Sequence, residues 1–133
     1  MDSCVFCKII KGELPSFKVY EDEENLAFLT IAPINPGHTL VIPKKHVSYI
    51  FKMRDKYLAS LMIASKKVAV VLKETFNPRT GKIGVMIAGG EVPHAHIHLI
   101  PMDLESDLSF DKVKHDIPLE EIKAAAKKIL RII

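Results

Sequence analysis

Three histidines stand at alternate positions, His94, His96 and His98, and imidazole can act as a nucleophile, an acid, a base or a metal ligand. Alternation with a period of two is typical of a β-strand, which sends successive side chains to opposite faces. The intervening Ala95 and Ile97 would then point into a core, and the histidines would form a row on the other face. A strand gains little stability from such a row, because imidazole has only middling β-propensity and needs hydrogen-bond partners when buried. The row therefore indicates a chemical site, with a solvated polar face of an ordinary sheet as the alternative.

The same spacing limits how the row could bind a metal ion. At about 3.3 Å per residue, the first and last histidines of the row lie roughly 13 Å apart. A zinc–nitrogen bond is only about 2.0–2.1 Å long, so one ion binds at most a neighbouring pair. At least one imidazole therefore keeps a free lone pair that can attack an electrophile.

The two cysteines of the chain, Cys4 and Cys7, form a second group of reactive residues. They are too few for the disulfide scaffold of a secreted protein. As a redox pair they lack the strand that precedes a thioredoxin-type motif. They could also be two inert buried thiols, or half of a metal site that needs two further ligands. All three interpretations stay open at this point.

The composition restricts the class of protein. A chain of 133 residues is one domain of ordinary size, and 48% hydrophobic residues exclude a disordered or fibrous protein. The net charge is +3, with lysines scattered among acidic residues, so we expect no nucleic-acid partner. No apolar run approaches the ~20 residues of a membrane span, and no signal peptide is visible. We therefore expect no membrane partner and a cytoplasmic location.

The N-terminal part of the chain predicts a short helix followed by strands. Residues 6–12 are typical of a helical turn that ends at Gly12. Turn-forming residues fill 32–37, between two apolar stretches. The predicted strands are residues 17–20, 26–31 and 38–42.

The middle of the chain predicts one long amphipathic helix over residues 55–76. A fourth strand is predicted over 82–88, then a tight connection at Gly89 and Gly90, and the histidine row over 92–101 as the fifth strand. Apolar residues recur at helical spacing in the long helix: they are Leu58, Leu61, Met62, Val68, Ala69, Leu72 and Phe76.

The C-terminal part predicts a second helix over residues 118–133, after a polar segment over 103–115 that has no clear period. Acidic residues in its first turn and basic residues near its end match the helix dipole. Such a basic amphipathic helix either packs on its own domain or lies on a membrane surface, and we favour the first. The buried stripe would consist of Leu119, Ile122, Ala126, Ile129, Leu130 and Ile133.

Three motifs agree in order and spacing with one known family. The histidine row is followed by Leu99 and Ile100, residues 4–9 read Cys-Val-Phe-Cys-Lys-Ile, and residues 36–46 read Pro-Gly-His-Thr-Leu-Val-Ile-Pro-Lys-Lys-His. Together they resemble the histidine triad (HIT) superfamily, in particular the Hint branch of histidine triad nucleotide-binding proteins. The resemblance implies an α+β fold: a roughly five-stranded antiparallel sheet with one long helix, a short N-terminal helix and a C-terminal helix. It also implies a single HIT domain over residues 1–133, with the helix over 118–133 packed on it.

The resemblance implies an enzyme. Hint-like proteins bind purine nucleotides such as AMP or GMP and hydrolyse the bond at the α-phosphorus, often that of a phosphoramidate. They pair as homodimers through the long helix and a sheet edge. The family nucleophile corresponds to His96, which would form a nucleotidyl-histidine, while His98 would donate to a phosphate oxygen or the leaving group. His38 would fix the tautomer of His96, through a carbonyl or by direct contact. The alternative is a nucleotide-binding or interaction protein with little turnover.

The resemblance also implies a nucleotide site. Residues of the first helix would hold the base, with plain core packing as the alternative, and Gly89 and Gly90 would bring N–H groups to the phosphate or simply form a tight turn. Two departures stand out: Thr30 replaces the aspartate that usually holds the ribose, and the loop before the row is short and carries Glu91. The implied nucleotide-binding residues are Val5, Phe6, Ile9, Phe28, Thr30, Gly89, Gly90, Glu91, His96 and His98.

Among the three interpretations of the cysteines, the resemblance favours a metal site. It implies that Cys4 and Cys7 bind a structural Zn²⁺ together with His46 and His94. A site closed by four protein ligands is structural rather than catalytic. It would also orient the strand that carries His96.

Overall fold

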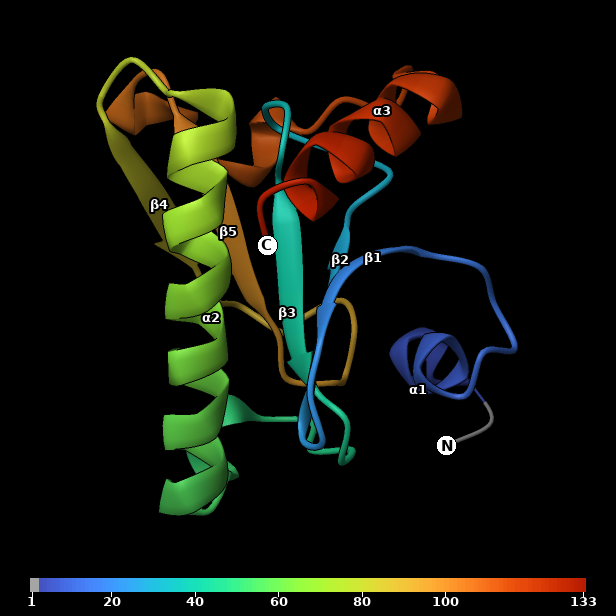
Figure 1. Ribbon diagram of the computed structural model, residues 1–133. Helices are drawn as coiled ribbons and strands as arrows, with labels where there is room; N and C mark the ends of the chain where they lie inside the picture. The colour runs from blue at the N-terminus through green and yellow to red at the C-terminus, as the bar shows by residue number, and fades with distance from the viewer. Residues whose placement is uncertain (1–2) are drawn as a thin grey trace.

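A five-stranded antiparallel sheet forms the centre of the computed structural model, which describes residues 3–133 (Figure 1). The strand order is β1-β2-β3-β5-β4, so β1 and β4 are the edges. The strands are β1 (Phe17–Glu21), β2 (Asn25–Leu29), β3 (Thr39–Pro43), β4 (Lys82–Met86) and β5 (Ile97–Met102). The α-helices are α1 (Val5–Ile10), α2 (Asp55–Phe76) and α3 (Leu119–Leu130), and the single 3₁₀ turns are η1 (Ile50–Lys52), η2 (Glu105–Asp107) and η3 (Phe110–Lys112). This architecture confirms the predicted α+β fold.

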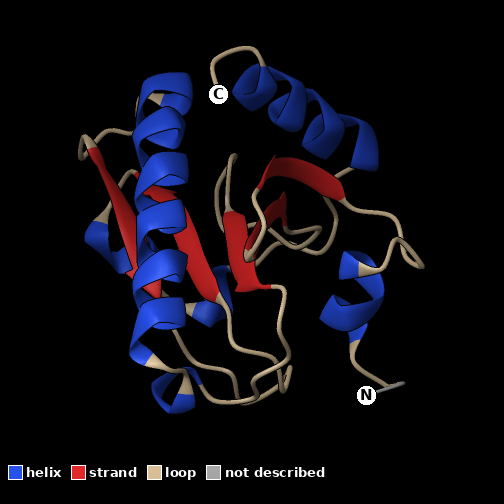
Figure 2. Ribbon diagram, turned by 60° about the horizontal axis from the view of Figure 1, so that its bottom comes forward, coloured by secondary structure: helices blue, strands red, loops and turns tan. Residues whose placement is uncertain are grey.

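The two faces of the sheet carry different cores. Alternation along β2 sends Ala27 to one face and Phe28 to the other. The first face packs on α2 and α3, and α2 runs alongside β4 and β5 in both views (Figure 1, Figure 2). The second face packs on α1 through a smaller cluster that includes Phe6 and Ile9. The histidines that could do chemistry lie on this second side.

The long helix begins and ends where the apolar period predicts, at Asp55 and Phe76. Gly12 ends the first helical turn with φ +79, a conformation that favours glycine. Gly37 also has a positive φ, and a Cβ there would lie 2.5 Å from the ring of Phe76. Glycine at this position therefore lets the turn before His38 approach the end of α2.

The prediction that the histidine strand begins at residue 92 is wrong, because β5 begins only at Ile97. The N–H of His94 donates to the Val92 carbonyl at 2.8 Å, and that of Ala95 donates to Val47 at 2.6 Å. Pro93 has no N–H for a strand partner. His94 and His96 thus lie in an irregular segment before β5. Strands β2 and β4 likewise end earlier than predicted, at Leu29 and Met86.

The predicted buried stripe of the C-terminal helix is too wide. Ile122, Ala126 and Ile129 are buried in the core, so α3 packs on its own domain as expected. Leu119, Leu130 and Ile133 are exposed instead, because a helix that lies on a sheet buries one narrow stripe and these residues lie beside it or at its ends. Met62 of α2 is exposed for the same reason. Within residues 3–133, no helix has the length and apolar character of a membrane span.

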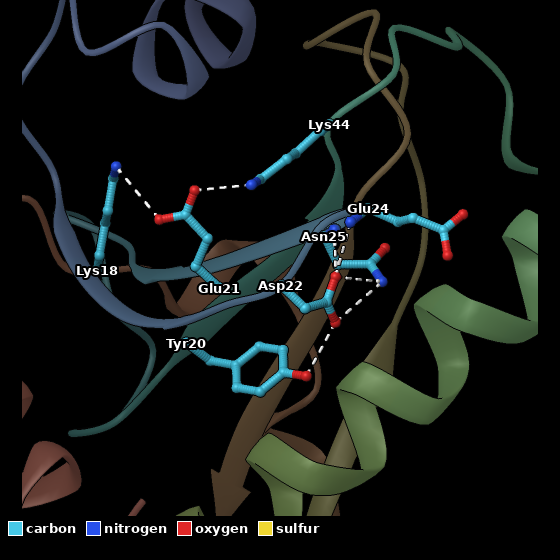
Figure 3. A network of polar contacts seen from close by, with 7 residues as sticks. All are labelled: Lys18, Tyr20, Glu21, Asp22, Glu24, Asn25 and Lys44. Atoms are coloured by element: carbon cyan, nitrogen blue, oxygen red, sulfur yellow. Dashed lines mark hydrogen bonds and ion pairs between the residues drawn. The ribbon is translucent and has the colours of Figure 1, made fainter.

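A polar network fixes the β1–β2 turn against α2 (Figure 3). The Asp22 carboxylate accepts hydrogen bonds from the Glu24 and Asn25 N–H groups at 2.8 and 2.7 Å, and from the Tyr20 hydroxyl at 2.8 Å. The buried Asn25 amide donates to the Ser60 hydroxyl of α2 at 2.9 Å. The hairpin that leads into β2 is therefore held at its tip.

Candidate active site and metal centre

The segment before β5 brings His94 and His96 against α1, and His98 follows them inside β5. The Phe6 ring packs edge-on against His94 and His96, with ring centroids 5.8 and 5.1 Å apart. His96 is 7% exposed and His94 is fully buried, so the row is not a solvated polar face. Ala95 and Ile97 point into the core on the other side, as predicted. His94 and His96 therefore lie in a packed, buried site.

The backbone of His94 fixes the tautomer of His96. The ring Nδ1 of His96 lies 2.7 Å from the carbonyl oxygen of His94. A carbonyl can only accept, so Nδ1 carries a proton, and in the neutral ring Nε2 keeps its lone pair. Within residues 3–133, no protein hydrogen bond uses that Nε2. The neutral ring of His96 therefore presents an unprotonated Nε2.

A second chain of hydrogen bonds fixes the tautomer of His98. The Ile34 N–H donates to Nδ1 of His38 at 3.0 Å, which places the proton of His38 on Nε2. That Nε2 lies 2.9 Å from Nδ1 of His98, which must accept. The proton of His98 is therefore on its own Nε2, and its ring centroid lies 5.0 Å from that of His96.

Burial keeps this histidine pair neutral. Burial, and to a smaller extent the neighbouring His98, lower the pKa of His38 to about 3. Burial and the neighbouring His96 lower the pKa of His98 to about 4. Both rings are neutral at pH 7, so the Nε2–H of His98 can donate a hydrogen bond without a positive charge on the ring.

The expected link from His38 to His96 is wrong. His38 contacts His98, and the carbonyl that orients His96 belongs to His94. The register explains the difference, because Leu40 of β3 faces His98 and His38 is thus its diagonal neighbour. His96 lies toward the opposite end of β3, out of reach of His38.

Sequence reasoning missed an aromatic residue of the site. The Phe110 ring of η3 packs against His98 with centroids 5.0 Å apart, and Phe110 is 44% exposed. The polar segment that carries it has no period from which its position could be predicted. The only feature of the sequence that could have indicated a role for Phe110 is a large apolar side chain among polar neighbours.

The implied nucleotide residues fall into two groups. Phe6 and Ile9 of α1 pack on Phe28 of β2, with the Phe6 and Phe28 rings 5.6 Å apart, whereas Val5 is exposed. The other residues lie in loops and make no hydrogen bond to the triad among residues 3–133. They are Thr30, whose hydroxyl accepts the Ala32 N–H at 3.1 Å, and Gly89, Gly90 and Glu91 between β4 and β5.

Four residues from three segments converge on one point. The ligand atoms of Cys4, Cys7, His46 and His94 all lie within 4.8 Å of one another. The distances from the two sulfurs to the two Nδ1 atoms are 3.5, 3.4, 3.2 and 3.6 Å. A tetrahedral ion with bonds of about 2.3 Å to sulfur and about 2.05 Å to nitrogen separates these atoms by roughly 3.6 Å. The cluster thus has the dimensions of a four-coordinate metal site.

The surroundings of the cluster determine which ligand atoms carry protons. The His94 Nε2–H donates to the Pro43 carbonyl at 2.8 Å, which leaves the Nδ1 lone pair facing the sulfurs. Both cysteines are free thiols, and Cys4 is the N-cap of α1 with Cys7 one turn later. Burial, together with the neighbouring Cys4 sulfur, raises the pKa of Cys7 to about 11. A metal ion must therefore displace protons when it binds. Cys4, Cys7, His46 and His94 could hold a metal ion.

Comparisons with known proteins all point to one family. The model of the HIT domain family matches residues 11–104. The chain is 38% identical to adenosine 5'-monophosphoramidase hnt1 of Schizosaccharomyces pombe over 131 residues, which cover 96% of each chain. Its structure is similar to that of a Hit-like protein involved in cell-cycle regulation from Bartonella henselae, with a TM-score of 0.83 at 33% identity over 100% of this chain and 98% of the other. It is also similar to a Zn-bound histidine triad family protein from Mycobacterium smegmatis, with a TM-score of 0.76 at 30% identity over 96% of each chain.

Proposed function

Because the chain belongs to the HIT family, we propose that it is a nucleotide hydrolase or nucleotidyl transferase that acts at the α-phosphorus of purine nucleoside phosphoramidates or related nucleotides. The observation that carries the proposal is the unprotonated Nε2 of His96 beside the N–H of His98. The Schizosaccharomyces pombe relative, named an adenosine 5'-monophosphoramidase, supports this substrate class. Residues 1–133 would form a single HIT domain.

In the first step, His96 Nε2 attacks the α-phosphorus and forms a phosphorus–nitrogen bond. The bond to the leaving amine breaks, and the amine takes the bonding electron pair and a proton from solvent. The ring of His96 gains positive charge, which its Nδ1–H shares with the His94 carbonyl at 2.7 Å. The His98 N–H would donate to a phosphoryl oxygen or to the departing group.

In the second step, water attacks the phosphorus of the nucleotidyl-histidine. The phosphorus–nitrogen bond breaks, its electron pair returns to Nε2, and a proton of the water goes to solvent. The nucleoside monophosphate is released, and His96 regains its starting tautomer.

The nucleotide would lie along the side of the sheet that carries α1. The base would contact Val5, Phe6, Ile9 and Phe28, of which Phe6 also touches His96. The ribose would lie near Thr30, and the phosphate near Gly89, Gly90 and Glu91 as well as His96 and His98. A positive φ of 83° at Gly89 permits a close backbone approach there.

We infer that the metal is zinc and that its role is structural. Two cysteines and two histidines form the donor set that zinc prefers, and no coordination position remains for substrate. The Zn-bound Mycobacterium smegmatis relative supports this identity. When bound, zinc supplies folding energy, and His94 would then be fixed at both ring nitrogens. Two free thiols in a metal cluster also suit the reducing cytoplasm.

We further propose a homodimer through α2 and β4. Strand β4 is a sheet edge whose Val85 is 47% exposed. The outer surface of α2 exposes Met62, Ile63 and Val70. Unpaired edge strands and exposed apolar surface are both features that a second copy would cover.

A nucleotide-binding protein with little turnover is the second candidate. The Glu91 carboxylate in the short loop before the triad favours it, because a negative charge there repels phosphate. A fluorogenic adenosine phosphoramidate separates the two candidates. An enzyme releases the amine continuously and in excess over protein, whereas a binding protein gives no steady release.

A further inference from the structure

The segment over residues 105–117 forms hydrogen bonds with the loop that carries His38. This segment lies outside the part of the chain that the family model matches, which ends at residue 104. It contacts the 33–38 loop at two points, through Asp107 and through Lys114. Both contacts lie close to the hydrogen bonds that determine the tautomer of His98.

Lys114 begins a chain of hydrogen bonds that ends at the triad. Its N–H donates to the Pro33 carbonyl at 3.0 Å. The N–H of the same peptide unit, that of Ile34, donates to His38 Nδ1 at 3.0 Å, and His38 Nε2–H donates to His98 Nδ1 at 2.9 Å. Every donor points toward His98, and hydrogen bonds in such a chain polarise and strengthen one another.

The Lys114 side chain holds the next peptide unit. Its ammonium donates to the Ile34 carbonyl. Lys114 therefore binds the carbonyl on either side of the Ile34 N–H and fixes the direction of that donor. Asn35 anchors the loop from the other side, because its amide donates to the Pro101 carbonyl at 2.8 Å and to the Asp107 carboxylate at 3.0 Å.

The direction of the Ile34 N–H excludes one arrangement of protons. In the reversed arrangement, His98 Nδ1–H would donate to His38 Nε2, and His38 would carry its proton on Nδ1. Two donors would then face each other between Ile34 and His38. If the loop loosened, this arrangement would become accessible, and His98 would present a lone pair instead of an N–H to the phosphate.

We propose that Lys114 is a positioning residue that holds His98 in its Nε2–H tautomer, through the Pro33–Ile34 peptide and His38. The consequence for catalysis rests on the proposed function, but the tautomer itself does not. The residue lies in the C-terminal segment, beyond the part of the chain that the HIT domain model matches.

The direct test is ¹⁵N NMR of histidine-labelled protein at pH 7 without nucleotide. In the wild type, His38 and His98 should each show a protonated Nε2 and an unprotonated Nδ1. Lys114→Met removes the ammonium, and Lys114→Pro also removes the N–H. Val113, with ψ 141, already has the conformation that precedes proline. Both variants should move the two His98 signals toward the average of the two tautomers, while Lys114→Arg and the exposed control Lys123→Met should match the wild type.

Turnover supplies a second readout. For a phosphoramidate with a poor leaving amine, we expect kcat to fall about 10-fold in Lys114→Pro and about 3-fold in Lys114→Met, because misplacing a catalytic group lowers the rate and not the affinity. KM should stay unchanged, and a substrate with a good leaving group should lose less than about 2-fold.

Wild-type His98 signals in a folded Lys114→Pro protein would overturn the proposal, as would equal losses for both substrates. If Lys114→Pro does not fold, the comparison of Lys114→Met with Lys114→Arg decides in the same way. A wild type without turnover would count against the proposed function alone, because the NMR signals would still report the tautomer.

Discussion

The ring Nδ1 of His96 lies 2.7 Å from the main-chain oxygen of His94, so a residue of the metal cluster orients the residue that we propose as the nucleophile. The ring of His94 is itself held between the Pro43 carbonyl and the Cys4 sulfur. The metal cluster and the triad are therefore one connected structure. A substitution of either cysteine should therefore alter the orientation of the His96 ring.

Metal removal should lower both stability and activity. We expect about one zinc per chain in protein purified without chelator, and loss of zinc in Cys7→Ser. A ligand present at about 100- to 1,000-fold above its dissociation constant stabilises by roughly 2.7–4.1 kcal/mol, which the variant should lose in urea unfolding. Lys8→Ala, on the same helix, should keep the metal. Wild-type protein without zinc under reducing conditions would contradict the assignment.

Stability should fall as the pH decreases below 6.5. Burial lowers the pKa of His38 to about 3 and of His98 to about 4, against about 6.5 in the unfolded chain. Between pH 6.5 and 4 the unfolded chain binds protons that the folded protein does not. Each of the two histidines should therefore lower the free energy of unfolding by about 1.4 kcal/mol per unit decrease in pH. Above pH 6.5 neither should contribute a pH dependence.

Urea titrations at pH 7, 6 and 5 measure this slope. His38→Asn should make it shallower, whereas replacement of the exposed His115 by Gln should leave it unchanged. Equal slopes for the wild type and His38→Asn would show that His38 is not held neutral by the fold.

Thr30 should weaken recognition of the ribose. A carboxylate accepts from both ribose hydroxyls, and hydrogen bonds to charged groups contribute about 1 kcal/mol more than neutral ones. The Thr30 hydroxyl already accepts the Ala32 N–H at 3.1 Å. Thr30→Asp should raise the affinity for AMP about 5-fold, with a smaller gain for dAMP. The neutral control Thr30→Asn should gain less. Calorimetry that finds an unchanged ratio of AMP to dAMP affinity would place the ribose elsewhere.

The proposed dimer predicts twice the mass of one chain in light scattering at micromolar concentration. Val85→Lys should shift the protein toward monomer, because it places a charge on the exposed edge strand. Leu130→Lys is the matched control, a similarly exposed apolar residue at the end of α3, where a cation suits the helix dipole. A wild type with the mass of a single chain would rule the dimer out.

The sequence predicted well what local pattern determines. The apolar stripe of α2 is contained in the helix itself, so its limits at Asp55 and Phe76 follow from the period. The start of β5 could not be predicted, because the Ala95 N–H bonds to Val47, a residue distant in sequence. An interaction of this kind leaves no periodic signal.

The residues of the site also divide into those that a local pattern relates and those that only the fold brings together. The two cysteines are one helical turn apart, which is a local pattern, whereas only the family resemblance connected them with His46. The partner of His38 depends on the register between β3 and β5, which places Leu40 opposite His98. No spacing within either segment contains that information.

Trapping the covalent intermediate tests whether His96 is the nucleophile. Wild-type protein should be mixed with adenosine 5'-phosphoramidate, quenched within milliseconds, digested and analysed by mass spectrometry. We predict one adenylyl group on the peptide that contains His96. We predict none in His96→Ala, which should bind AMP but lose several orders of magnitude in turnover. A near wild-type rate in His96→Ala, or an adenylyl group on another residue, would show that His96 is not the nucleophile.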